Sequence, residues 1–395
     1  MNKSLVPKIR FKGFDDEWKK YKLNDIGIFF RGLYKKTKAD FEINNSNFYY
    51  VTYTNIYNNR FIKIDSLKYV NINKNENQNH LVKGDILFTM TSETYNEVGL
   101  CSIFNSDTDN VYLNSFCSGF RIIDIRVINS IFLLFLLLSI QYREKIIKMA
   151  NGFTRYNLSK KLLLNLQVKI PNIIQQNLIG NFFTIIDRKI ELVKEQLSLL
   201  AKQKQYYLNN MFANEKSYPK IRFKGFNDEW ESKKIGEILN YQQPTKFIIK
   251  DKIENQGKIP VLTANKSFVL GYVNEKNIYE NIPVIIFDDF TMDMKYVNFK
   301  FMIKSSAIKI LKSKNNNINL FYVFNLLKNL KLFSSDHKRY YISYVSEINV
   351  LFPNIYEQTK VAHFFTIIDK KIELVKEQLS LLAKQKQYYL NNMFI

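Results

Sequence analysis

The sequence has few of the residues on which catalytic and metal sites depend. Its three histidines, His80, His337 and His363, lie far apart and form no HExxH or comparable metal-binding spacing. No two of its 12 glycines are two positions apart, so the GxG core of a nucleotide-binding glycine loop is absent. We therefore predict no catalytic residue and no metal site in this chain.

Cysteine, proline and long apolar runs are also scarce. The two cysteines, Cys101 and Cys117, form no CxxC pair, and no signal peptide opens the sequence, which together predict a cytoplasmic protein. None of the 7 prolines are adjacent, so the Pro-Pro-aromatic motif with which DNA amino-methyltransferases hold an extruded base is missing. The longest apolar run, from Ile131 to Ile140, is about half of the roughly 20 residues that a membrane span needs, so we expect a buried helix there and no membrane partner.

Acidic residues are outnumbered by basic ones. The chain has 58 Lys and Arg against 36 Asp and Glu, a net charge of +22 at pH 7, and the excess is spread along the chain. Such a balance favours a polyanionic partner, although a Lys-rich solvated surface has the same composition. The charge alone therefore leaves both interpretations open.

The most informative feature is a long internal repeat. Residues 182–212 return as residues 364–394 with a single change, Arg188 to Lys370. Both copies carry apolar residues alternately four and three positions apart, which is the pattern of a coiled-coil seam. The predicted seam residues are Ile186, Ile190, Val193, Leu197, Leu200, Tyr207 and Met211 in the first copy and Ile368, Ile372, Val375, Leu379, Leu382, Tyr389 and Met393 in the second.

Each seam is interrupted once, by Lys204 in the first copy and by Lys386 in the second. A polar residue at such a position costs stability and fixes register or orientation. We expect the two copies to form an intramolecular antiparallel coiled coil. The alternative, in which each helix packs separately on its own domain, is disfavoured by the near-identity of the two helix surfaces.

A shorter repeat opens each half of the chain. PKIRFKGFDDEW, residues 7–18, returns as PKIRFKGFNDEW, residues 219–230, with Asp15 replaced by Asn227. Each half therefore has the same order of a short repeat, a variable region and a long helix. We predict a pseudo-twofold molecule whose two globular domains, residues 1–172 and 215–354, alternate with helical regions at residues 173–214 and 355–395.

The two variable regions share little identity but carry corresponding signals of secondary structure. A helix is predicted at Ser130–Leu138 in the first region and at Leu320–Leu327 in the second. Pro171 and Pro353 occupy equivalent places and predict the turn from a strand into each long helix. Strands rich in β-branched and aromatic residues are predicted at residues 47–56, 84–90, 118–125, 258–264 and 282–290. The expected fold class is α+β, with two globular domains separated by the pair of long helices.

This arrangement resembles the specificity subunit of type I restriction-modification systems, and the likeness covers essentially the whole chain. Its most specific elements are PNIIQQNLIGNFFTIIDRKIELVKEQLSLLAKQK at residues 171–204, PNIYEQTKVAHFFTIIDKKIELVKEQLSLLAKQK at residues 353–386, and KGDILFTM from Lys83. The resemblance implies that each variable region is a target recognition domain that reads one half of a split DNA sequence. It also implies that the helices form the spacer and dock modification subunits.

The resemblance further implies a chain that is non-catalytic by itself. Its partners would be double-stranded DNA, two methyltransferase subunits, and restriction or translocase subunits that complete an endonuclease complex. S-adenosylmethionine, ATP and magnesium would be cofactors of those partners and not of this chain. The alternative is an orphan DNA-binding protein or coiled-coil adaptor without enzyme partners, and co-purification with two methyltransferase chains would separate the two possibilities.

Polar side chains in loops at strand ends are the candidates for DNA contact, because polar groups read base edges and Lys and Arg hold phosphates. The alternative is that Thr, Asn and Asp at such positions cap turns. The second domain has NIPVIIFDD, residues 281–289, where the first has GDILF, so its DNA-facing loop is less well defined. The candidates are Thr89, Thr91, Ser92, Glu93, Tyr95, Asn96, Arg155 and Tyr156 in the first domain, and Thr263, Asn265, Lys266, Asp288, Asp289, Thr291, Lys338, Arg339 and Tyr340 in the second. The two Arg-Tyr pairs are the strongest of these candidates.

The length of the repeated helix agrees with a spacer. Residues 186–212 would rise roughly 40 Å at about 1.5 Å per residue. That is the length of roughly a dozen base pairs of B-DNA at about 3.4 Å each. We therefore expect the helices to set the gap between two half-sites.

Overall fold

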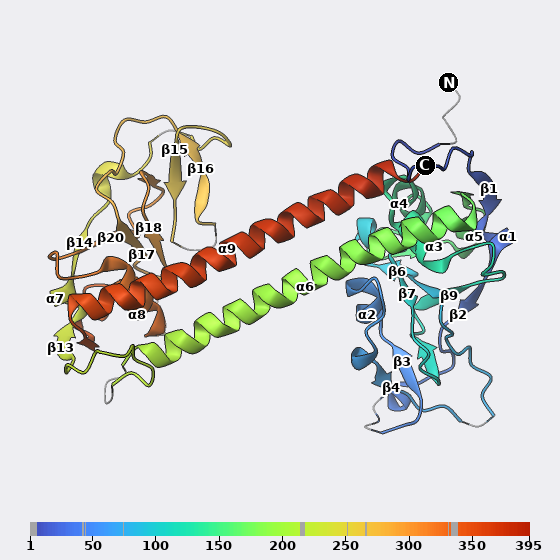
Figure 1. Ribbon diagram of the computed structural model, residues 1–395, viewed down its shortest axis with the longest axis horizontal. Coiled ribbons are helices and arrows are strands. Elements are labelled where there is room, and N and C mark those ends of the chain that lie inside the picture. The colour runs from blue at the N-terminus through green and yellow to red at the C-terminus, as the bar shows by residue number, and fades with distance from the viewer. Residues whose placement is uncertain are drawn as a thin grey trace. The chain divides into compact units, whose positions relative to one another are not determined.

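The computed structural model describes residues 6–41, 43, 45–73, 75–213, 218–250, 252–264, 267–330, 332 and 339–395. The chain forms two compact units (Figure 1). Unit 1 comprises Met1–Val193 with Gln378–Ile395, and unit 2 comprises Lys194–Glu377. Each long helix therefore contributes one end to each unit. None of the described helices combines the length and the apolar character needed to cross a membrane.

Unit 1 is built around a four-stranded antiparallel sheet in the order β2-β9-β5-β7, in which β5 is buried along its whole length. Three smaller sheets, β1-β12, β4-β3-β8 and β10-β11-β6, complete it. The strands are β1 (Lys19–Lys22), β2 (Gly27–Arg31), β3 (Tyr49–Val51), β4 (Lys68–Tyr69), β5 (Asp85–Thr89), β6 (Thr91–Ser92), β7 (Cys101–Phe104), β8 (Val111–Leu113), β9 (Cys117–Ile122), β10 (Ala150–Asn151), β11 (Tyr156–Leu158) and β12 (Gln167–Ile170). The shorter helices are α1 (Leu23–Ile26), α2 (Tyr53–Asn58), α3 (Ser130–Leu138), α4 (Ile140–Ile147) and α5 (Lys160–Leu164).

The core of unit 1 forms around α3. The side chain of Asn129 caps this helix by accepting a hydrogen bond from the backbone N–H of Phe132 at 2.8 Å. Residues 132–137 are all fully buried, as expected for a helix that is apolar on every side. Phe135 stacks on Phe183 of α6, with ring centroids 5.0 Å apart. The buried helix predicted at Ser130–Leu138 is confirmed at both ends.

Unit 2 repeats three of the four sheets of unit 1, and its described residues form no counterpart of β10-β11-β6. Its four-stranded sheet has the order β14-β20-β17-β18, and β13 pairs with β21 as β1 pairs with β12. In each unit a three-stranded sheet joins one parallel and one antiparallel pair. The strands are β13 (Glu231–Lys234), β14 (Leu239–Gln242), β15 (Ile259–Leu262), β16 (Val269–Val273), β17 (Val284–Asp288), β18 (Met294–Val297), β19 (Met302–Ile303), β20 (Ile308–Ser313) and β21 (Asn349–Phe352), and the short helices are α7 (Ile235–Ile238) and α8 (Leu320–Asn329). The segment NIPVIIFDD thus supplies β17, the counterpart of the GDILF strand β5.

The two long helices, α6 (Ile173–Met211) and α9 (Ile355–Asn392), begin in the same way. Each follows a strand and a proline, Pro171 or Pro353, which confirms the predicted strand-to-helix turns. The predicted α+β fold class is confirmed as well, with mixed sheets in both units and the long helices connecting them in the chain.

A buried glutamine anchors the first turn of each long helix. The amide nitrogen Nε2 of Gln176 donates to the carbonyl of the preceding proline at 2.9 Å, and that of Gln358 does the same at 2.8 Å. Their amide oxygens accept hydrogen bonds from the backbone N–H groups of Asn129 and Asn319, both at 2.9 Å. Since Asn129 and Asn319 cap α3 and α8, each glutamine ties the start of a long helix to the start of a core helix.

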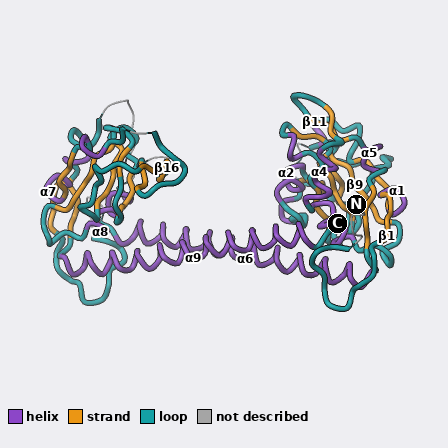
Figure 2. Tube along the Cα trace, turned by 90° about the horizontal axis from the view of Figure 1, so that it is seen from above, coloured by secondary structure: helices purple, strands orange, loops and turns teal. Residues whose placement is uncertain are grey.

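Within unit 1, α6 and α9 lie side by side and run antiparallel (Figure 2). The ring of Phe182 meets that of Tyr389, with centroids 4.9 Å apart, and Phe183 stacks on Phe394 at 5.5 Å. Phe394 also contacts Trp18 of the short repeat at 6.4 Å. The end of the chain is therefore part of the core of unit 1.

Within unit 2 the same contacts recur with the two helices exchanged. Tyr207 of α6 meets Phe364 of α9 at 4.8 Å, and Phe212 stacks on Phe365 at 5.8 Å. Each contact joins the residues that correspond, through the long repeat, to a contact in unit 1. The predicted intramolecular antiparallel pair is confirmed by these contacts within each unit.

The lysine that interrupts each seam makes an ion pair with the opposite helix. Lys386 contacts Asp187 in unit 1, and Lys204 contacts Asp369 in unit 2. Both lysine side chains are only 16% exposed, so water screens the pairs incompletely. A slip of one helix along the other would separate both pairs, and we infer that they fix the register.

The predicted seam residues lie buried or half-buried on both helices. Those that are less than a tenth exposed are Ile186, Val193, Met211, Ile368, Val375 and Met393.

One predicted strand is shorter than expected and is followed by a helix. Residues 47–56 were expected to form a strand, but β3 ends at Val51 and α2 begins at Tyr53. The hydroxyl of Thr52 accepts a hydrogen bond from the backbone N–H of Asn55 at 3.2 Å, and this cap outweighs the β-propensity of the tyrosines and threonines.

One buried ion pair distinguishes unit 2 from unit 1. The carboxylate of Glu357, which is 1% exposed, accepts two hydrogen bonds from Arg222 at 2.7 and 2.8 Å and one from the indole Nε1 of Trp230 at 3.0 Å. The repeat places Gln175 at the equivalent position of unit 1, where the amide Nε2 of Gln175 and the indole nitrogen of Trp18 have no hydrogen-bond partner among the described residues. Glu357 therefore binds the second copy of the short repeat to α9 more strongly than Gln175 binds the first copy to α6.

We predict that Glu357→Gln destabilises unit 2 by about 2 kcal/mol, because it leaves the half-buried guanidinium of Arg222 without its carboxylate. Urea unfolding in a Trp18→Phe background measures this effect, since Trp230 is then the one tryptophan and reports on unit 2. Glu373→Gln, an exposed change on the same helix, is the matched control and should leave the midpoint unchanged. Equal midpoints for the two variants would contradict the assignment.

Candidate nucleic-acid interface

Two segments that were predicted separately form one surface in unit 1. β6, which follows the buried strand β5, pairs antiparallel with β11, so that Ser92 lies opposite Tyr156. The ring of Tyr95 contacts that of Tyr156, with centroids 5.1 Å apart. The loop after the GDILF strand and the Arg-Tyr segment at Arg155 are thus brought together by a short three-stranded sheet.

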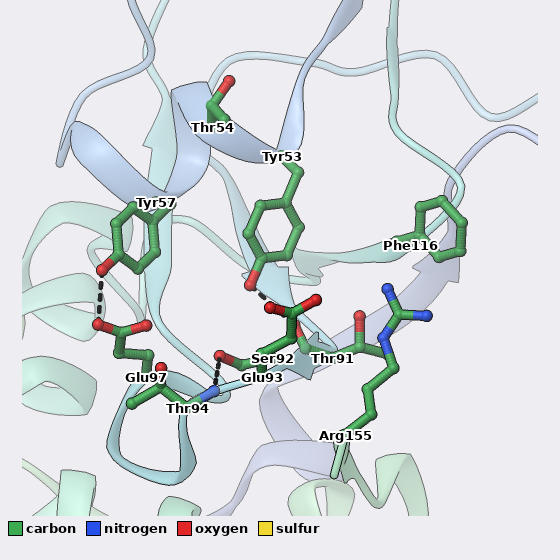
Figure 3. A pocket seen from close by; sticks show the side chains of 10 residues that line it. All are labelled: Tyr53, Thr54, Tyr57, Thr91, Ser92, Glu93, Thr94, Glu97, Phe116 and Arg155. Carbon is green, nitrogen blue, oxygen red and sulfur yellow. Dashed lines mark hydrogen bonds between the residues drawn. The ribbon is translucent and has the colours of Figure 1, made fainter.

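A pocket with a volume of about 320 Å³ opens on this surface (Figure 3). Four of the predicted residues line it: Thr91, Ser92, Glu93 and Arg155. Aromatic, hydroxyl, carboxylate and guanidinium groups therefore surround one concave site. Such a mixture suits a ligand that has both flat apolar faces and polar edges.

Hydrogen bonds hold the aromatic wall of the pocket in place (Figure 3). The hydroxyl of Tyr57 donates to the carboxylate of Glu97 at 2.6 Å, and that of Tyr53 donates to the backbone carbonyl of Thr91 at 2.8 Å. The bond to Glu97 raises the pKa of Tyr57, and burial raises the pKa of Tyr53, so both remain protonated donors at neutral pH. Both tyrosines come from α2 and are four residues apart, which places them on one helix face.

Arg155 and Glu93 are the charged groups of the pocket that are free to meet an outside partner. Both side chains are exposed, and within the described part of the chain neither has an ion-pair partner. The guanidinium of Arg155 lies 5.7 Å from the ring centroid of Phe116. Arginine matches the O6 and N7 acceptors of guanine, and a carboxylate matches the N4 amino group of cytosine.

Arg143 of α4 organises the loop that follows the pocket strand. Its guanidinium donates to the backbone carbonyls of Gly99 at 2.7 Å, Val98 at 2.9 Å and Asn96 at 3.1 Å. Burial lowers the pKa of Arg143, but the group is so basic that it stays charged at neutral pH. Three carbonyls on one cation hold this loop, which also carries Glu97, in a single conformation.

Several residues of the site were not predicted from the sequence. Tyr53 lay in a stretch expected to be a strand and Tyr57 directly after it, and Glu97, Phe116 and Arg143 are far from them in the chain. The capping threonine before α2 was the one local signal that could have placed both tyrosines on a helix face. No local pattern relates Arg143 to a loop more than 40 residues earlier.

The prediction for Thr89 is wrong. This residue lies at the end of β5 and is 0% exposed. Its hydroxyl donates to the carbonyl of Leu100 at 3.2 Å, so it completes the sheet and cannot contact DNA. Ser92 is also largely buried, and its hydroxyl accepts from the backbone N–H of Thr94 at 3.1 Å. Tyr95 and Asn96 are exposed beside the pocket.

In unit 2 the predictions for Asp288, Asp289 and Tyr340 are wrong, because these residues are buried parts of the core. Asp289 is 1% exposed and pairs with the equally buried Lys309 at 3.2 Å. Asp288 accepts hydrogen bonds from the backbone N–H groups of the turn that follows β17, both at 3.0 Å. This is the turn-capping alternative to DNA contact.

The remaining candidates of unit 2 differ in their exposure, and some lie outside the described residues. Thr291 and Arg339 are exposed, and Thr263 is 9% exposed. Asn265, Lys266 and Lys338 lie outside the described residues. The described residues of unit 2 therefore bring together no set of candidates comparable to the pocket of unit 1.

Comparison with known proteins identifies relatives by sequence. The family model for the type I restriction modification DNA specificity domain matches residues 15–202 and 227–384. The type I restriction enzyme EcoR124I/EcoR124II specificity subunit of Escherichia coli is 39% identical over 193 residues, which cover 45% of this chain and 46% of that protein. The aligned region therefore spans about half the length of this curated relative.

Solved structures share the fold. The S subunit of a type I restriction-modification system from M. genitalium has a TM-score of 0.68 at 17% identity, over 99% of both chains. A chain from work on complex assembly and conformational transition of the type I R-M system has a TM-score of 0.52 at 13% identity, over 96% of this chain and 98% of that chain. At these identities the likeness concerns the fold alone. The two family-model matches, one in each repeat and together covering most of the residues, establish that the chain belongs to the type I restriction modification DNA specificity family.

Proposed function

We propose that this chain is the non-catalytic subunit that recognises DNA for a type I restriction-modification complex. Each unit would read one half of a bipartite target. The observation that carries the proposal is the repeated framework of both units, in which a four-stranded sheet, a mixed three-stranded sheet and a two-stranded sheet hold two different sets of surface loops. Family membership and the net charge of +22 support a role at a polyanion.

The pocket of unit 1 is the proposed reading site for one half-site. Arg155 and Glu93 would meet base edges in the major groove, while the hydrogen-bonded tyrosines and Arg143 keep the surrounding loops fixed. Preorganised loops lose little conformational freedom on binding, so more of the contact energy is available for discrimination between bases.

The proposed partners are two methyltransferase subunits, each docked on one end of the helix pair. In unit 1, the register that joins Asp187 to Lys386 puts Leu192 of α6 level with Leu381 of α9. Both leucines are exposed, at 46% and 66%. Ile185 and Tyr388, also exposed, extend this apolar patch along the helices.

The long repeat places the same four residue types in unit 2. The equivalent exposed residues are Ile367 and Leu374 of α9 and Leu199 and Tyr206 of α6. Two matching apolar patches, one in each unit, favour two copies of one partner over a single asymmetric partner. The methyl transfer, translocation and cleavage, with their S-adenosylmethionine, ATP and magnesium, would reside in the partner subunits.

We also propose that the paired helices set the distance between the two half-sites. Their register is held by the crossed lysine-aspartate pairs, and the first turn of each helix is anchored by Gln176 or Gln358. A helix pair fixed in this way resists both sliding and fraying, which a spacer requires.

The test uses a duplex that the wild-type chain selects from a random pool. Arg155→Ala should weaken binding of the full chain to this duplex about tenfold, because a bidentate contact to a base contributes about 1–3 kcal/mol. It should also relax the base preference at one position of one half-site. Fluorescence anisotropy and a repeated selection measure the two effects.

The matched control is Arg126→Ala, which removes an exposed arginine of unit 1 that lies outside the pocket and pairs with Asp124. Loss of a phosphate contact alone would weaken all sequences equally and change only the salt dependence. An Arg155→Ala variant with the affinity and preference of the control would show that the pocket does not read bases.

Leu381→Glu should remove one methyltransferase copy from the purified complex, because it places a charge at the centre of the patch in unit 1. Leu199→Glu, its equivalent in unit 2, should do the same, and the double variant should bind no copy. Native mass spectrometry of the co-expressed subunits counts the copies.

Gln385→Glu, an exposed polar change on α9, is the control and should keep both copies. A wild-type chain that purifies with no methyltransferase would favour an orphan DNA-binding protein or adaptor. An unchanged count in the double variant would move the docking surface away from these patches.

A further inference from the structure

An unusual aromatic residue stands beside the proposed reading pocket. Phe153 is 99% exposed, the highest value for any large hydrophobic side chain in the described residues. Single exposed apolar residues are common, but a phenylalanine buries most of its ring in an ordinary fold because its apolar area is large. Phe153 contributes nothing to the core of unit 1.

The segment that carries Phe153 is a short hairpin. It joins β10 to β11, which pair antiparallel, and β11 in turn pairs with β6 of the pocket. Gly152 has φ +123°, and a Cβ there would lie 2.0 Å from the carbonyl oxygen of Arg155. Only glycine fits this close approach, so the turn is tight and holds Phe153 at its tip.

The surroundings of this tip are aromatic and basic. Arg155, two residues after Phe153, lines the pocket and lies over the ring of Phe116, which is 56% exposed. Tyr95, exposed as well, contacts Tyr156 on the neighbouring strand. Arginine interleaved with exposed aromatic rings is the pattern that binds nucleic-acid bases through stacking and charge.

We propose that Phe153 is a wedge that enters the base stack of the half-site read by unit 1. The inference rests on the proposed DNA-reading function of the pocket and adds a deformation of the duplex to it. The hairpin would place the ring between two base pairs while Arg155 and Glu93 read the adjoining edges. Apolar wedges of this kind unstack a base step and kink the duplex.

A wedge would also serve the chemistry that a partner performs. A methyltransferase must take its target base out of the helix, and this step has to overcome stacking and pairing. A ring inserted at a nearby step would weaken the stacking before the base leaves. Phe153 would then act as a positioning residue for the reaction, without touching the reacting atoms.

The test uses the full chain and duplexes selected by the wild type from a random pool, with 2-aminopurine replacing each adenine in turn. The fluorescence of this base rises when it loses stacking. The wild type should raise the fluorescence at one step in one half-site. Phe153→Ala should lose that rise and bind about tenfold more weakly, in keeping with the stacking contribution of about 1–3 kcal/mol per base.

Phe153→Trp should keep both the fluorescence rise and the affinity, because a larger ring can still insert. Ile125→Ala is the control: Ile125 is 77% exposed in unit 1 but belongs to the turn between β9 and α3, so the variant should behave as the wild type. Since Phe153 makes no core contact, circular dichroism should show all variants folded.

The outcomes separate the wedge from the function on which it rests. A wild type that selects no sequence from the pool would overturn the DNA-reading function itself. Selective binding without any fluorescence rise, or a rise that persists in Phe153→Ala, would overturn the wedge and leave the reading function standing. Loss of partner subunits in Phe153→Ala with an unchanged fluorescence rise would assign the residue to protein docking and overturn the wedge.

Discussion

The crossed lysine-aspartate pairs are the interaction on which the rest of the structure depends. Two copies of one helix sequence could pair in parallel or antiparallel, since both orientations bury the same apolar seam. In a parallel, in-register pair Lys204 would face Lys386, and two like charges would meet in a partly buried seam. In the antiparallel pair each lysine meets an aspartate of the opposite helix, in unit 1 and again in unit 2. Orientation and register therefore follow from one lysine and one aspartate in each copy.

This constraint explains why the two halves of the chain differ where they do. The long helices, the glutamines at their first turns and the short repeats form a common framework. A substitution in one long helix also alters its contacts with the other, so the two copies cannot change independently. The loops at the strand ends take no part in the pair, so they are free to diverge. Phe183 with Phe394 and Phe212 with Phe365 show the framework entering both cores by the same stacked contact. Different surfaces can thus be carried by one scaffold.

The features that could be predicted from the sequence are those that local pattern determines. The heptad spacing located the helix pair, the prolines located the starts of the long helices, and an apolar run located α3. Only part of the pocket was predicted from the sequence. Thr91, Ser92, Glu93 and Arg155 were predicted, but α2 and its tyrosines were not. Pairing of β6 with β11 is a contact between distant segments, and no local pattern encodes it.

The errors in unit 2 have a related cause. Asp288 ends a strand and Asp289 follows it, where DNA-reading residues were expected, and their identity gives no sign of burial. The partner that buries Asp289 is Lys309, a lysine within a neighbouring strand that a sequence pattern would place at the surface. A polar residue at a strand end is therefore a weak indicator of function unless its exposure is known.

The central claim is that the paired helices measure the distance between two half-sites, and matched insertions test it most directly. One heptad inserted after Leu197 and one after Leu379 would preserve the seam, the crossed pairs and both units while lengthening each helix by about 10 Å. Methylated adenines would then be mapped across the genome of cells that carry the altered chain with its partner subunits. The account predicts unchanged half-sites separated by about three more base pairs, at about 3.4 Å each. An unchanged gap, or altered half-sites, would contradict it.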